Sequence, residues 1–137
     1  MKKLYTLLSL AFLMTACSPE EIIEKQENLI IQAMTTGQWT VTSYSRAGTD
    51  ITTDFSPYKF KFNTNFTVDA FNGTSVEKSG DWNADGTAQT ITSNFINATH
   101  PLVLLNGTWT ITKTTWTSVE ANITVGTEYR TLRLDKQ

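Results

Sequence analysis

The amino-acid sequence predicts an all-β fold, an eight-stranded antiparallel up-and-down barrel that follows a short N-terminal helix. Seven Phe, four Trp and four Tyr residues, together with abundant threonine, favour strands. From residue 38 onward, short runs of alternating apolar and polar residues are separated by turn-forming residues. One apolar face on consecutive strands fits a closed barrel, which also leaves no exposed edge strand; a two-sheet sandwich is the alternative.

Residues 1–16 have the three parts of a secretory signal. Residues 1–3 give a positive start, residues 4–14 are apolar, and two small residues follow. The apolar stretch is too short to span a bilayer stably. We therefore expect residues 1–16 to be a signal peptide that is removed on export.

The run Met14-Thr15-Ala16-Cys17 resembles the lipobox of bacterial lipoproteins. The resemblance implies that the Cys17 thiol receives a diacylglycerol and that Cys17 becomes the first residue of the mature protein. Acyl chains such as palmitate would then anchor the protein in the outer membrane, at its periplasmic face or at the cell surface. Cys17 is also the only cysteine, so lipidation removes a thiol that has no disulfide partner. The alternative is a plain signal peptide that contains a cysteine.

Residues 17–36 are expected to form the lipidated N-terminus and a helical tether. Ser18 can cap a helix, Pro19 suits the first helical position and Glu21 completes a capping box. Apolar residues recur in a helical pattern as far as Met34. We expect a short helix that packs across one end of the next domain, and a bare spacer is the alternative.

Residues 37–137 are expected to form the barrel domain. Eight strands are predicted, most of them joined by short turns of residues that suit hairpins, so neighbours should pair antiparallel. The strands span residues 38–46, 57–63, 66–72, 75–83, 87–95, 107–113, 117–125 and 127–135. The longer connections are residues 47–56 and residues 96–106, and the second predicts one helical turn or an apolar flap.

Period-two alternation assigns one face of each strand to the core. The predicted inward residues are Trp39, Val41, Tyr58, Phe60, Phe62, Phe66, Val68, Ala70, Ile91, Ile111, Val119, Ala121, Ile123, Leu132 and Leu134. Their sequence neighbours are mostly Thr, Lys, Asp or Glu, which predicts a polar outer face.

Three Gly-x-Trp triplets occur at comparable places in three predicted strands, at residues 37–39, 80–82 and 107–109. A glycine two residues before an inward tryptophan lies on the same face, where it leaves room for the indole or for a bend. Together with the final strand, residues 131–136, the triplets resemble the lipocalin-like lipoproteins of Bacteroidetes. The resemblance covers most of residues 37–136 and implies a lipocalin-like or calycin-like barrel.

No set of residues in the sequence forms a recognisable catalytic, metal or cofactor site. His100 is the only histidine, Cys17 is used by lipidation, and there is no glycine-rich phosphate loop. We therefore expect no enzyme activity and no cofactor. The formal net charge of −2 provides no basic surface, so nucleic acid is not an expected partner. We expect a monomer.

Two charged residues break the inward alternation, because Lys78 aligns with Trp82 and Arg130 lies on the predicted inward face of the last strand. Candidate ligand contacts are therefore Trp82, Lys78, Arg130, Trp39 and Tyr58. In the alternative interpretation, each cation lies near a barrel end and extends into water, or Arg130 stacks on Trp39 as an arginine does in lipocalins.

Two functions fit these observations. The first is a non-catalytic binding module, anchored in the outer membrane, that holds a small apolar or amphipathic molecule, or a peptide, at the mouth of its barrel. The second is a structural or interaction lipoprotein with a solid barrel, whose outer surface contacts another envelope protein or a glycan. A narrow eight-stranded interior filled by aromatic side chains would favour the second function.

Overall fold

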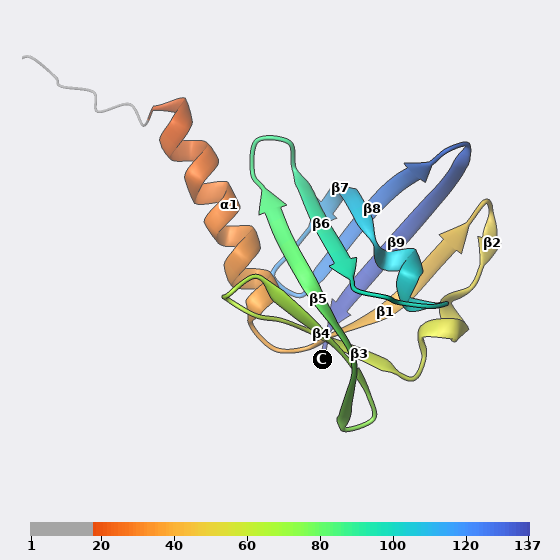
Figure 1. Ribbon diagram of the computed structural model, residues 1–137. Coiled ribbons are helices and arrows are strands. Elements are labelled where there is room, and N and C mark those ends of the chain that lie inside the picture. Colours follow the sequence, from red (N-terminus) through yellow and green to blue (C-terminus); the bar gives the residue numbers. More distant parts are fainter. Residues whose placement is uncertain (1–17) are drawn as a thin grey trace, which may run out of the picture.

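The computed structural model describes residues 18–137 and shows an N-terminal helix followed by a closed antiparallel barrel (Figure 1). The predicted signal peptide, residues 1–16, and the predicted lipid attachment at Cys17 lie outside the described residues. The helices and strands given below are those of residues 18–137.

Helix α1 spans Pro19–Thr35, as the sequence predicts. Its first turn carries the expected capping box: the Glu21 amide donates to the Ser18 hydroxyl, and the Ser18 amide donates to the Glu21 carboxylate, both over 3.3 Å. Within residues 18–137, no helix is long and apolar enough to cross a membrane.

Eight strands form the barrel, in agreement with the prediction. They are β1 (Trp39–Arg46), β3 (Tyr58–Phe62), β4 (Thr67–Asn72), β5 (Ser75–Asp85), β6 (Thr90–Phe95), β7 (Gly107–Thr114), β8 (Ser118–Val125) and β9 (Glu128–Lys136). A ninth strand that the sequence did not predict, β2 (Thr49–Asp50), extends one end of β1. Two 3-10 helices, η1 (Thr52–Phe55) and η2 (Leu102–Leu105), occupy the two longer connections.

The sheet closes because β1 pairs with β9 along its whole length, from Trp39 opposite Lys136 to Arg46 opposite Arg130. On its other side, β1 meets β3 only at Trp39 and Phe60. Beyond that point β1 contacts η1 instead of β3: the Tyr44 amide donates to the Thr52 hydroxyl at the start of η1 over 2.9 Å. The barrel is therefore closed, with its weakest seam between β1 and β3.

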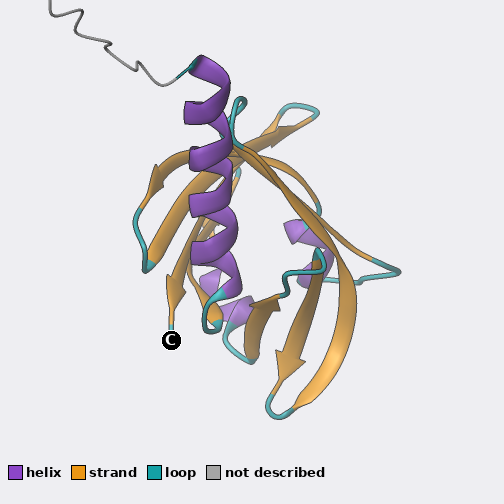
Figure 2. Ribbon diagram, turned by 90° about the vertical axis from the view of Figure 1, so that its left-hand side faces the viewer, coloured by secondary structure: helices purple, strands orange, loops and turns teal. Residues whose placement is uncertain are grey.

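One end of the barrel, here called the helix end, is covered by the last turns of α1 (Figure 2). Ile30, Ala33 and Met34 are buried there against the core. The Trp39 indole N–H donates to the Met34 carbonyl over 2.9 Å, which joins the helix to the first strand. The expectation of a helix across one end of the domain is confirmed.

The opposite end, here called the turn end, is closed by η1 and η2. Phe55 of η1 and three leucines of η2 are buried, so the apolar flap predicted in residues 96–106 is a lid over this opening. Tyr44 joins the two turns, because its ring stacks on Phe55 with centroids 4.9 Å apart and its hydroxyl donates to the Leu104 carbonyl over 2.7 Å. Both ends of the barrel are thus covered.

Most predicted core residues are buried, but the alternation fails at two places. A bulge between Val41 and Ser43 shifts the parity of β1, so the inward residue beyond it is Tyr44. Phe66 was predicted to be inward, and this prediction is wrong. It lies in the β3–β4 turn with a φ of +64° and is 41% exposed, with its ring against Trp82.

The three Gly-x-Trp glycines were predicted to leave room for the indole or for a bend, and the contacts found around them are with other groups than the indole. Gly37 and Gly107 have φ angles of +77° and +124°, a region that residues with a Cβ rarely adopt. At Gly80 a Cβ would meet the backbone of the paired strand β6. At each of the three positions the backbone conformation or its close packing favours glycine, and each position lies two residues before a buried tryptophan.

Candidate functional site

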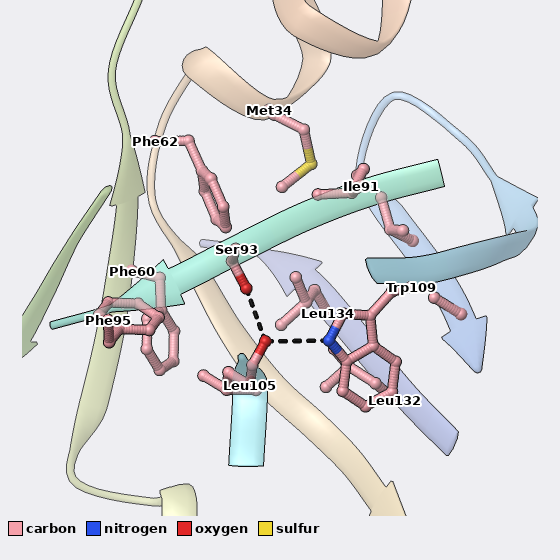
Figure 3. A pocket seen from close by; sticks show the side chains of 12 residues that line it. Met34, Phe60, Phe62, Ile91, Ser93, Phe95, Leu105, Trp109, Leu132 and Leu134 are labelled. Atoms are coloured by element: carbon pink, nitrogen blue, oxygen red, sulfur yellow. Dashed lines mark hydrogen bonds between the residues drawn. The ribbon is translucent and has the colours of Figure 1, made fainter. Parts of the chain in front are cut away.

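The interior of the barrel is almost filled. A cavity of about 40 Å³ lies between the strands and α1, and Figure 3 shows the side chains around it. It is lined by Met34, Phe60, Phe62, Ile91, Ser93, Phe95, Leu105, Trp109, Val119, Ala121, Leu132 and Leu134. Sites for small molecules usually enclose about 300–1,000 Å³, so this cavity is too small for such a ligand.

The polar groups around this cavity are already satisfied. The Ser93 hydroxyl donates to the Leu105 carbonyl over 2.6 Å, and the Trp109 indole N–H donates to the same oxygen over 2.9 Å (Figure 3). A carbonyl oxygen has two lone pairs, so Leu105 is fully used by these donors. The interior therefore offers a ligand neither space nor a free hydrogen-bonding group.

A larger hollow opens at the turn end, with a volume of about 350 Å³. Six residues line this mouth hollow: Tyr58, Glu77, Lys78, Thr99, His100 and Leu102. Tyr58 begins β3, Lys78 lies in β5 on the parity of Trp82, and His100 lies just before η2. Two of the five predicted ligand contacts, Tyr58 and Lys78, therefore meet in one place.

The mouth hollow combines hydrogen-bonded polar groups with a lysine that forms no ion pair. The His100 ring nitrogen Nε2 lies 2.8 Å from a carboxylate oxygen of Asp54 in η1. Glu77 raises the pKa of Tyr58 to about 12, chiefly because the phenol donates a hydrogen bond to its carboxylate. Lys78 forms no ion pair with any residue that the structure describes. These groups suit a ligand that carries an anionic head and some apolar surface, which Leu102 would contact.

The other three predicted contacts are placed elsewhere. Trp39 and Trp82 are buried, and the Trp82 indole N–H donates to the Asn63 carbonyl over 3.0 Å. Arg130 is largely buried and lies 2.5 Å from the Glu128 carboxylate. Neither indole presents a surface to the mouth hollow, and Arg130 already has an anionic partner.

The stacking of Arg130 on Trp39, considered from the sequence, does not occur. Lys136 takes that place instead, with its Nζ 4.9 Å from the Trp39 ring and 4.7 Å from the Trp116 ring. Burial lowers the pKa of Lys136, and its buried Nζ has no hydrogen-bond partner in the described part of the chain. The two indoles therefore stabilise this ammonium by cation–π contacts.

Sequence analysis missed His100 and Glu77 as parts of the candidate site. His100 is an exposed residue of the second long connection, and Glu77 is the extra residue at a bulge in β5. Only the folding of residues 96–106 across the turn end brings His100 to Tyr58 and Lys78. No group of three His, Cys, Asp or Glu side chains within residues 18–137 is arranged to hold a metal ion.

The chain matches no protein-family model. No curated protein matches it either. Among solved structures, a DUF4847 family protein from Bacteroides vulgatus aligns with a TM-score of 0.53 and 14% sequence identity, over 79% of this chain and 99% of that chain. The barrel fold is shared with a Bacteroides protein. This likeness supports the resemblance to Bacteroidetes proteins at the level of fold, while the lipocalin-like lipoprotein assignment stays a prediction.

Proposed function

We propose that this protein is a lipid-anchored, non-catalytic binding module of the outer membrane that holds an amphipathic, acidic ligand in its mouth hollow. The observation that carries this proposal is the contrast between two spaces. The interior encloses about 40 Å³ and has no free polar group, whereas the mouth hollow offers about 350 Å³ beside an unpaired lysine. A ligand would therefore bind across the turn end of the barrel, not inside it.

The anchor in this proposal is Cys17, with acyl chains in the outer membrane at the periplasmic face or the cell surface. We expect Cys17→Ser to abolish labelling by radioactive palmitate and to leave the signal peptide uncleaved. Immunoblotting for chain length and scintillation counting of the immunoprecipitated protein would measure both effects. Ser18→Ala is the control, since it keeps the thiol and changes only the neighbouring cap. A palmitate signal that survives Cys17→Ser would disprove the anchor.

The mouth hollow can be tested with a fatty acid as the probe ligand. We expect residues 18–137 to bind laurate, and Lys78→Gln to weaken binding about tenfold, or ~1.4 kcal/mol, because the carboxylate loses its cationic partner. Isothermal titration calorimetry would measure the affinity. Lys113→Gln, at an exposed position in β7, is the matched control. Equal affinities of Lys78→Gln and Lys113→Gln for laurate would show that the mouth hollow is not the binding site.

A solid interaction lipoprotein is the second candidate, and the filled interior is the observation that favours it. In that case the outer face of the strands would contact another envelope protein or a glycan. An untargeted mass-spectrometric search for small molecules that copurify with the protein separates the two functions. A retained acidic amphiphile supports the binding module, and its absence together with a copurifying protein or glycan supports the interaction lipoprotein.

A further inference from the structure

Three large apolar side chains are exposed on one side of the helix end. Ile22 and Leu29 of α1 are 47% and 59% exposed, and Trp116 in the β7–β8 turn is 50% exposed. A groove of about 370 Å³, lined partly by Leu29, Ala33 and Trp116, lies between the helix and this turn. These positions bring the exposed flank of α1 and the Trp116 indole together on one surface, here called the apolar flank.

Three of the four glutamates of α1 lie on the side of the helix away from the apolar flank, whereas Lys25 lies nearer to it. Ile22, Gln26 and Leu29 follow each other at helical spacing and share one side of the helix. Glu20, Glu24 and Glu27 have the same spacing but are turned by more than a third of a circle toward the opposite side. Glu27 confirms this direction, since it accepts a hydrogen bond from the Gly86 amide of the β5–β6 turn over 3.5 Å.

Trp116 is held in place although its ring is half exposed. Lys136 lies over its ring, with Nζ 4.7 Å from the centroid, and also contacts the buried Trp39. A fixed, half-exposed tryptophan beside apolar side chains is typical of the membrane interface, where the ring is partly in hydrocarbon and partly in water. The apolar flank therefore has the residue types of an interfacial contact.

We propose that the apolar flank rests on the interfacial region of a lipid bilayer. The proposal rests on the Cys17 anchor of the proposed function, because residue 17 immediately precedes the Ser18 cap of α1. At 1.5 Å per residue, Ile22 and Leu29 lie roughly 6 and 17 Å from Ser18 along the helix, within reach of the same membrane surface. Glu20 and Glu24 would then face water, and Glu27 the β5–β6 turn, all three away from anionic lipids.

This placement also fixes the orientation of the barrel relative to the bilayer. The helix end would lie against the bilayer, and the mouth hollow at the turn end would face away from it, open to ligands. A protein partner for the apolar flank would have to compete with the lipid surface to which the start of α1 is already tied.

Tryptophan fluorescence provides a direct test, because the other three tryptophans, Trp39, Trp82 and Trp109, are buried in the barrel. The chain from residue 17 to 137 is coupled through its only thiol to vesicles that contain a maleimide lipid. The bilayer is phosphatidylcholine brominated near the top of its acyl chains, and bromine quenches only indoles that reach this depth. We expect bromine-dependent quenching in the parent chain and none in Trp116→Phe.

Two further variants test the helix. Leu29→Glu should reduce the quenching about two-fold, because a carboxylate opposes insertion of this side of α1. Val125→Glu, which replaces a 45% exposed valine at the turn end, should leave the quenching unchanged. Equal emission from the coupled parent chain in brominated and plain vesicles would overturn the proposal. Because the coupling is chemical, this result does not depend on acylation in cells, and palmitate labelling tests that anchor separately.

Discussion

Replacement of Gly80 by alanine should be among the most destabilising single changes in the barrel, at ~3 kcal/mol or more. A Cβ at this position would lie 2.1 Å from the Asn94 carbonyl oxygen and 2.8 Å from the Phe95 Cα. Both atoms belong to the backbone of β6, which is paired with β5 at this point. No side chain can rotate away, so the two strands must separate and lose pairing next to the buried Trp82.

Urea denaturation followed by circular dichroism would measure this effect as a fall in the unfolding midpoint. Gly73→Ala is the matched control: Gly73 has a φ of +65°, but a Cβ there meets nothing within 4 Å. Gly73→Ala should lower the free energy of unfolding by only about 1 kcal/mol, because of backbone strain at the positive φ. If Gly80→Ala proved no worse than Gly73→Ala, the close approach of β5 and β6 would not be a determinant of stability.

Gly80 also shows what the sequence could and could not predict. The Gly-x-Trp pattern marked this residue as special, and period-two alternation placed Trp82 correctly in the core. The cause could not be predicted, because the distance between β5 and β6 depends on pairing across the turn that joins them. Alternation is reliable within a strand that carries no extra residue of its own. Val119 in β8 and Leu132 in β9 are therefore placed correctly in the core, although the neighbouring strands β7 and β1 contain bulges.

Alternation fails where one strand gains an extra residue. The bulge after Val41 turns Tyr44 inward, and no local sequence signal marks that bulge. The candidate site was predictable only in part for a similar reason. Tyr58 and Lys78 were selected by their parity, whereas His100 reaches them only through the folding of residues 96–106, whose path is set by the burial of η2.

The filled interior leads to the second large prediction, which concerns Trp109. Trp109→Ala should destabilise the protein by about 3–5 kcal/mol, since it removes a buried indole that lines the small cavity. The Leu105 carbonyl keeps the hydrogen bond from Ser93, so the truncation leaves no unsatisfied acceptor. Globular proteins have about 5–15 kcal/mol of stability, and we therefore expect the variant to remain folded at low temperature.

The same truncation should create a cavity on the order of 150 Å³, dry and apolar, which is large enough for benzene. We expect benzene to raise the melting temperature of Trp109→Ala, because it binds only the folded state, and to leave that of the parent protein unchanged. Trp109→Phe is the control, since a phenyl ring leaves too little space for the probe. Stabilisation of the parent protein by benzene would mean that its interior already admits ligands. Binding inside the barrel would then replace binding at the mouth hollow as the favoured function.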